Sequence, residues 1–160
     1  CAQWMGKDSV MAYKHVLAAV DLSEESAQVL EKARAQADQA GAKLSVVSVV
    51  KPLTQVYGGI DVAPLAGSAV SFEEQAIEQA EKQLRDLAAR YGVKAEDAHA
   101  ILGAPAHDIR ELAGQLGVDL IVIGTHGRHG FGLLLGSTAS AVLHGVERDV
   151  LAVRVHFEDE

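Results

Sequence analysis

A glycine-rich segment in the last third of the chain contains the residues whose types and spacing best suit ligand binding. It reads Gly124-Thr-His-Gly-Arg-His-Gly130 and is followed by Gly136-Ser137-Thr138. Glycine allows positive φ angles and close approach of the backbone, so several main-chain N–H groups can point at one anion. A helix opening at Ser137 would add unpaired N–H groups and a favourable dipole. The segment therefore predicts a phosphate-binding loop, with contacts from Gly124, Gly127, Arg128, His129, Gly130, Gly136, Ser137 and Thr138.

The sequence offers little support for other chemistries. A Rossmann or Walker nucleotide site would carry a glycine pattern directly after the first predicted strand. Asp21-Leu-Ser23 stands there instead, so neither site is present. His126 and His129 are three residues apart, but neither cysteine nor carboxylate lies beside them in this glycine-rich stretch, which argues against zinc. No nucleophile–base pair is evident, so we expect a binding protein without catalytic residues.

Strand-like and helix-like patterns alternate along the chain. Short apolar or β-branched runs predict strands at 15–20, 44–50, 98–102, 119–124 and 149–155. Three- and four-residue spacings of apolar residues predict helices at 23–40, capped by Ser23, and at 72–91, 105–116 and 137–145. This alternation predicts an α/β fold: one doubly wound domain with a five-stranded, mostly parallel sheet in the order 3-2-1-4-5 and helices on both faces.

Three candidate site residues come at the ends of predicted strands. Asp21 follows the first strand, Val49 lies at the end of the second, and Gly124 ends the fourth. In open α/β sheets, ligands bind beyond the carboxyl ends of the strands, where the strand order reverses. The first and fourth strands adjoin that point in the expected order. We therefore expect Asp21, Val49 and the glycine loop to lie around one crevice.

Length, charge and cysteine content limit the class of protein. A chain of 160 residues suits one domain, and its formal net charge of −8 includes no run of Lys and Arg, so nucleic acid is not an expected partner. Apolar stretches reach only about five residues, which excludes a membrane-spanning helix and favours the cytoplasm. The single cysteine excludes an internal disulfide. We interpret residues 1–10 as a disordered leader or a remnant of cloning and residues 11–157 as the domain. Within the domain, we interpret residues 53–71 as a long mobile connection.

From Met11 to Val155 the sequence resembles the universal stress protein family. The resemblance rests on Met-Ala-Tyr-Lys-His at 11–15, Val-Asp-Leu-Ser at 20–23, Gly-Thr-His-Gly at 124–127 and Leu-Leu-Leu-Gly-Ser at 133–137. It implies a fold like that of the adenine-nucleotide alpha hydrolases. ATP-binding members carry two glycines separated by two residues, then nine further residues, and then a glycine followed by serine or threonine. Here only eight residues separate Gly127 from Gly136.

The resemblance also implies roles for individual residues. Asp21 would contact the ribose or a metal ion on the phosphates, Val49 would lie against adenine, and the glycines with Ser137 and Thr138 would hold the phosphates. The implied ligand is ATP or another adenine nucleotide with Mg²⁺. The implied protein is a cytoplasmic homodimer, joined through the strand Asp149 to Val155, which regulates a stress response through an unidentified protein partner.

Two alternatives remain open at this point. The protein could be a slow ATPase or could phosphorylate itself, since Ser137 or Thr138 would lie where a phosphate could be transferred. It could instead be a nucleotide-free dimer that acts only through protein contacts. The eight-residue gap favours this second alternative, and so does the amino-terminal half, which resembles the subclass whose founding member lacks the glycine loop.

Overall fold

Five parallel strands form one sheet in the computed structural model, which describes residues 12–51, 66–125, 137–144 and 146–156. The strands are β1 (His15–Ala19), β2 (Lys43–Val50), β3 (Ala98–Leu102), β4 (Leu120–Gly124) and β5 (Asp149–Val153). Their order is β3-β2-β1-β4-β5, and all neighbouring strands are parallel. The predicted strand order and directions are confirmed.

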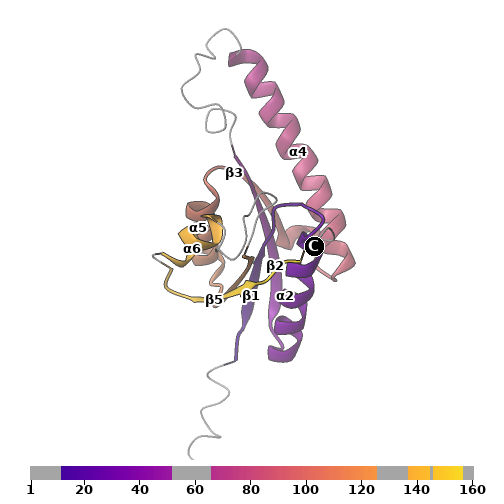
Figure 1. The fold of residues 1–160 in the computed structure, drawn as a ribbon. Coiled ribbons are helices and arrows are strands. Elements are labelled where there is room, and N and C mark those ends of the chain that lie inside the picture. The colour runs from indigo at the N-terminus through magenta and orange to yellow at the C-terminus, as the bar shows by residue number, and fades with distance from the viewer. Residues whose placement is uncertain (1–11, 52–65, 126–136, 145, 157–160) are drawn as a thin grey trace, which may run out of the picture.

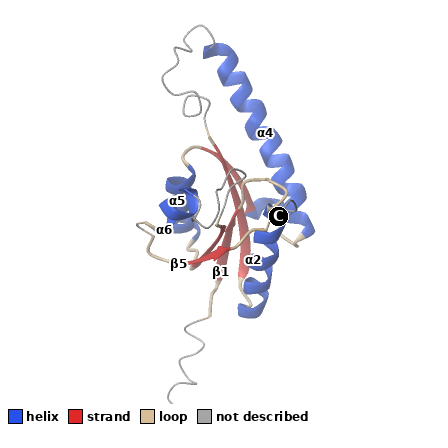
Figure 2. Cartoon of the chain, in the orientation of Figure 1, coloured by secondary structure: helices blue, strands red, loops and turns tan. Residues whose placement is uncertain are grey.

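Helices cover both faces of this sheet (Figures 1 and 2). They are α2 (Ser26–Ala40), α4 (Ala66–Arg90), α5 (Pro105–Leu116) and α6 (Ser137–Leu143), with a short 3-10 helix, η3 (Ala95–Asp97), before β3. The helices α2 and α4 pack on one face, and α5 and α6 pack on the other. The doubly wound arrangement expected from the sequence is confirmed.

Alternating residues of the central strands supply two separate apolar cores. In β1, Val16 and Ala18 belong to the core beneath α2 and α4, whereas Leu17 and Ala19 belong to the core beneath α5 and α6. None of the four is more than 5% exposed. A strand buried on both faces has no solvent side on which to place polar residues, which is why β1 is continuously apolar.

Two helix boundaries differ from those predicted. The helix α2 begins at Ser26, and its N-cap is Glu25 rather than Ser23, whose hydroxyl donates to the Asp21 carboxylate. The helix α4 begins at Ala66, whereas the sequence placed its start at Phe72. Residues 66–71 are mostly small and lack the apolar periodicity of the rest of the helix, so the sequence did not indicate them. In Figure 1 this end of α4 extends beyond the sheet. The rest of the predicted connection, 53–65, lies outside the described residues.

The two last elements are shorter than predicted. The helix α6 ends at Leu143 and β5 ends at Val153, two residues before the expected ends. Beyond β5, the Gln28 side chain makes two hydrogen bonds with the backbone of His156: Nε2 donates to the carbonyl oxygen at 2.7 Å, and Oε1 accepts from the N–H at 2.9 Å. This clamp holds the segment after β5 against α2, and Val155 is only 6% exposed.

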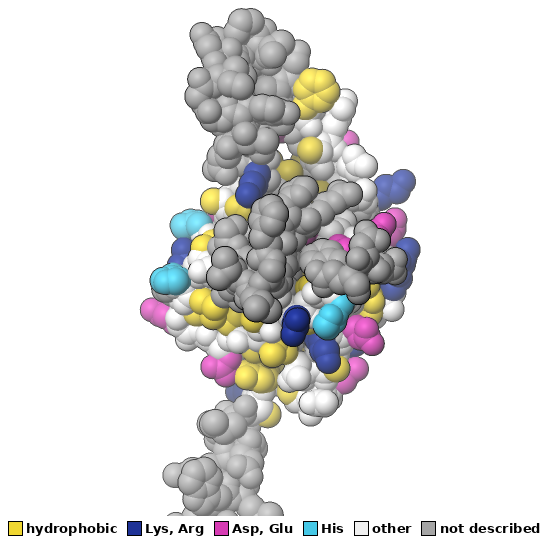
Figure 3. Space-filling view, in the orientation of Figure 1, with side chains coloured by type: hydrophobic (Ala, Val, Ile, Leu, Met, Phe, Trp, Pro, Cys, Tyr) yellow, Lys and Arg dark blue, Asp and Glu magenta, His cyan; other side chains and the backbone are white. Residues whose placement is uncertain are grey.

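The surface and the helices show two further features. On the described part of the face in Figure 3, Asp and Glu side chains lie among the Lys and Arg side chains rather than apart from them. None of the helices in the described ranges is both long enough and apolar enough to cross a membrane.

Replacing Gln28 with alanine should loosen the segment after β5. Each exposed hydrogen bond contributes about 0.5–1.5 kcal/mol, so the free energy of unfolding should fall by about 1 kcal/mol in urea titrations. The His156 amide should exchange its hydrogen faster, because its acceptor has gone. Gln39→Ala, on an exposed position of the same helix, is the control. Equal exchange at His156 in both variants would show that the clamp does not hold the segment.

The stability of the fold should also depend on the protonation of His99 in the edge strand β3. Its Nε2 atom is buried and has no hydrogen-bond partner within the described residues. Burial lowers the pKa of this imidazole below its ordinary value; Asp97 opposes the shift, and the charges of Lys43 and His15 add to it.

Because the pKa of His99 is lower in the folded chain, the unfolded chain binds more protons at pH values just below about 6.5. Stability should therefore rise with pH through that window and become level above it. His99→Val cannot take up the proton, so acidification from pH 7.5 to 5.5 should cost the variant less unfolding free energy than the wild type. Identical losses in denaturant titrations would contradict this role of His99.

Candidate functional site

A cavity of about 250 Å³ lies at the carboxyl ends of β1 and β4. These are the neighbouring strands from which the chain continues to helices on opposite faces of the sheet, which is where open α/β sheets bind ligands. The described residues that line it are Ala19, Val20, Asp21, Ser23, Glu25, Ser26, Val29, Val49, Lys51, Pro105, Ile109, Ile123, Gly124, Thr138, Ala139 and Val155.

Four of the predicted site residues line this one cavity although they are far apart in sequence. Asp21 follows β1, Val49 lies near the end of β2, Gly124 ends β4, and Thr138 lies in the first turn of α6. Ser137 begins α6, directly before Thr138. The remaining predicted contacts lie outside the described residues: Gly127, Arg128, His129, Gly130 and Gly136.

The Asp21 carboxylate is held in a tight turn at the rim of the cavity. Its Oδ1 atom accepts hydrogen bonds from the Ser23 N–H at 3.0 Å, the Ser23 hydroxyl at 2.5 Å and the Ser26 hydroxyl at 3.1 Å. Leu22, between them, adopts a positive φ of 61°. Such a conformation is uncommon for a residue with a side chain and occurs often at ligand sites. Asp21 thus organises the turn, and the turn places its carboxylate at the cavity.

Lys51 and Ser26 line the cavity but were not among the predicted contacts. Lys51 follows β2 in the same way that Asp21 follows β1, so the rule that ligand-binding residues follow strands could have found it. Ser26 is 2% exposed and was assigned only to a helix, since its contact with Asp21 depends on the turn between them.

The cavity walls also include residues that no local pattern marks as functional. Pro105 and Ile109 come from the start of α5, and Val155 comes from the segment held by Gln28. The sequence indicates that Ile109 and Val155 are apolar and buried. Only the arrangement of α5 and the chain after β5 shows that these side chains also form walls of a cavity.

Within the described residues, a histidine ring contacts a serine hydroxyl, a pairing that the sequence did not reveal. His15 Nε2 lies 2.8 Å from Ser45 Oγ, and His15 Nδ1 lies 3.3 Å from the Leu116 carbonyl oxygen. Ser45 is 1% exposed and pairs with Leu17 in the middle of β1. The hydroxyl cannot be reached from solvent and is not among the described cavity residues, so we assign the pair to the interior of the fold.

The architecture and the sequence can now be compared with those of known proteins. A model of the universal stress protein family matches residues 12–154. The universal stress protein A homolog 1 of Coxiella burnetii is 43% identical over 143 residues, which cover 89% of this chain and 97% of that protein.

Solved structures agree with this match. A universal stress protein from Lactobacillus plantarum superposes with a TM-score of 0.67 at 25% identity, and a universal stress protein in complex with cAMP superposes with a TM-score of 0.61 at 26% identity. Each comparison covers 89% of this chain and 98% of the other. The chain belongs to the universal stress protein family.

Proposed function

We propose that this protein binds an adenine nucleotide in the cavity beyond β1 and β4 and acts as a dimeric regulator of a stress response. The observation that carries the proposal is the convergence of Asp21, Val49, Gly124 and Thr138 on one cavity. We propose that it acts in the cytoplasm and that it acts through a regulatory protein partner, as we expected from the sequence.

The lining of the cavity combines the chemistries that a nucleotide requires. Val49, Ile109 and Ile123 offer apolar surface for a purine ring, and hydroxyl and carboxylate groups at the turn after β1 offer hydrogen-bond partners for a ribose. The volume of about 250 Å³ lies just below the range of small-ligand pockets, about 300–1,000 Å³, and suits a nucleoside with its phosphates directed outward.

The phosphates would extend toward the glycine-rich segment that begins at Gly124. Lys51 is the one cation among the described cavity residues, and we propose that it neutralises part of the phosphate charge. Of the two carboxylates that line the cavity, Asp21 and Glu25, we propose that Asp21 holds Mg²⁺ against the phosphates, since oxygen ligands suit that ion.

A relative provides independent support for an adenine ligand. The universal stress protein that is 26% identical to this chain was solved in complex with cAMP. The described cavity residues include neither histidine nor cysteine, so we propose binding rather than rapid chemistry as the function of the site.

Thermal denaturation with ATP, ADP, AMP or cAMP, each at millimolar concentration with Mg²⁺, tests this proposal. A ligand at 100 times its dissociation constant adds about 2.7 kcal/mol, which should raise the melting temperature by about 5–10 °C. Asp21→Ala should remove most of the rise because it removes the carboxylate. Gly127→Val should remove most of it because the valine side chain would occupy the space proposed for the phosphates. Asp86→Ala, at an exposed position of α4, should retain it.

The same experiment separates the proposal from its alternatives. If none of the nucleotides raises the melting temperature of the wild type, the proposal is wrong and the protein acts without a nucleotide. A rise that persists in Gly127→Val would show that the glycine-rich segment is not the phosphate site. Phosphate release from ATP above the level of Gly127→Val would instead indicate a slow ATPase.

The dimer would form through the edge strand β5. Within the described residues β5 pairs only with β4, and its neighbourhood is ordered by a 2.8 Å hydrogen bond from the Tyr13 hydroxyl to Asp149 Oδ2. A free strand edge presents N–H and C=O groups that another chain can pair with. We therefore propose that two copies associate along Asp149 to Val155.

A lysine at Ala152, an exposed position of β5, should prevent this association, because it places a charge on each copy at the same interface. Light scattering should give about twice 16.9 kDa for the wild type and 16.9 kDa for Ala152→Lys. Ala89→Lys, on the exposed face of α4, should remain dimeric. A dimeric Ala152→Lys would place the interface elsewhere.

A further inference from the structure

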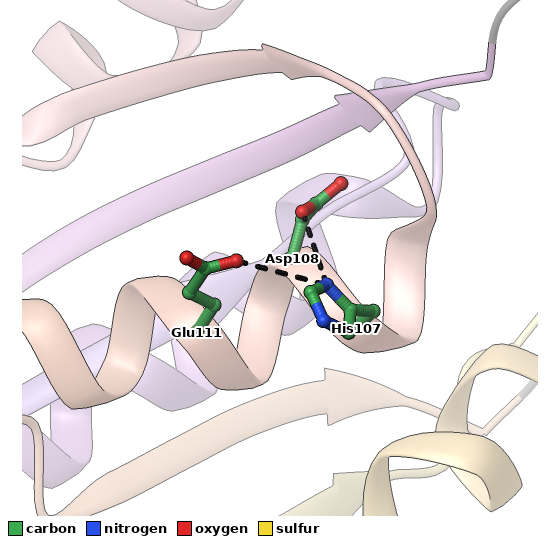
Figure 4. A group of neighbouring side chains, drawn as sticks. All are labelled: His107, Asp108 and Glu111. Carbon is green, nitrogen blue, oxygen red and sulfur yellow. Dashed lines mark hydrogen bonds and ion pairs between the residues drawn. The ribbon is translucent and has the colours of Figure 1, made fainter.

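One imidazole and two carboxylates form a cluster on the first two turns of α5, on the surface of the protein. His107, Asp108 and Glu111 point toward one another in Figure 4, and one potential ligand atom from each residue lies within 4.8 Å of those of the other two. His107 Nδ1 lies 3.4 Å from Asp108 Oδ1 and 3.7 Å from Glu111 Oε2. We propose that these three side chains bind a divalent transition metal of the zinc class.

The distances from His107 to the two carboxylates suit such an ion. With metal–ligand bonds of about 2.0–2.2 Å, neighbouring ligand atoms in a tetrahedral or octahedral site lie roughly 3.0–3.5 Å apart. The His107–Asp108 distance already falls in this range, and the His107–Glu111 distance exceeds it by only a few tenths of an ångström. Glu111 is exposed and belongs to the same helix face as His107, one turn later, so a small rotation of its side chain closes the gap.

The Asp108 carboxylate is held in position by the backbone at the start of the helix. Its Oδ2 atom accepts a 2.7 Å hydrogen bond from the Ala104 N–H, while Oδ1 faces His107. Gly103 makes this position possible, because a Cβ atom there would lie 1.9 Å from Asp108 Oδ2. A hydrogen bond to the second carboxylate oxygen is a common way in which proteins orient a metal ligand.

The donor set selects the kind of metal. Two carboxylates supply two negative charges, which balance a divalent cation, and the imidazole nitrogen favours zinc or cobalt over magnesium and calcium, which prefer oxygen. Three protein ligands leave coordination positions for water. The His107 and Glu111 side chains are 69% and 55% exposed, so an ion can enter directly from solvent.

This site is separate from the cavity proposed for the nucleotide. From the same helix, the cavity takes Pro105 and Ile109, and Ile109 is 4% exposed. His107 and Glu111 lie on the outward side of α5 and are not among the described cavity residues. Zinc binding here therefore requires no nucleotide and can be tested without one.

Calorimetric titration of the full chain with Zn²⁺, in a buffer that does not chelate metals, tests the proposal. All proteins carry Cys1→Ser, so the thiol does not compete for the ion. We expect one Zn²⁺ per chain, and at least tenfold weaker binding by His107→Gln and by Glu111→Gln. Glutamine preserves side-chain length and helix propensity at both positions. His144→Gln, at the exposed residue directly after α6, and Glu78→Gln, at an exposed position of α4, are the controls and should bind like the parent.

Two further measurements identify the ligand atoms. Asp108→Asn retains an oxygen that can accept from the Ala104 N–H but lacks the charge, so it should weaken Zn²⁺ binding without lowering the melting temperature of the metal-free protein by more than about 2 °C. In nitrogen NMR spectra, Zn²⁺ should shift Nδ1 of His107 in the parent. Wild-type affinity in both His107→Gln and Glu111→Gln, a shift confined to other histidines, or no binding at millimolar Zn²⁺ would overturn the proposal.

Discussion

The burial of β1 on both faces is the constraint on which the rest of the structure depends. This strand lies between β2 and β4 in the middle of the sheet, and its apolar side chains are almost completely removed from water. Removing apolar surface from water is the main source of stability in such a domain. Because each face of β1 requires a cover, the chain must place helices on both sides of the sheet, as α2 with α4 and α5 with α6 do.

The same arrangement creates the cavity. All five strands are parallel, so their carboxyl ends share one edge of the sheet, and the helices begin near that edge. After β1 the chain leads to α2 on one face, and after β4 it leads to α6 on the other, and the cavity lies at the carboxyl ends of these two strands. The turn at Asp21 and the end of β4 at Gly124 border this space because of topology, independently of any ligand.

The helix α5 shows how one element can contribute to two separate chemistries. Its inward residues Ile109, Leu112 and Ala113 pack beneath the sheet, and Ile109 also reaches the cavity. Its outward residues carry the imidazole and carboxylate cluster. The backbone before the helix positions the cluster, since the Ala104 N–H donates to the Asp108 carboxylate and Gly103 leaves room for it. A rigid helix therefore fixes both sets of side chains relative to the sheet.

The sequence by itself indicated the four helices, the five strands and the family, because apolar runs, helical spacing and motifs are local properties. The alternation of strands and helices also predicted the strand order, which the pairing in the sheet confirms. The sequence also determined helix ends at Gly41 and Gly117, whose φ angles of 66° and 68° are readily adopted by glycine. It indicated Asp21, Val49 and Gly124 through the rule that ligand sites follow strands.

Tertiary structure decided which distant side chains meet. The Ser23 hydroxyl bonds to Asp21 rather than capping α2, Val155 becomes a cavity wall because Gln28 holds the chain beyond it, and Asp108 is oriented by the Ala104 N–H. Each outcome depends on competition among hydrogen-bond partners whose positions are set by the packed sheet and helices. A linear pattern of residue types contains no such distances.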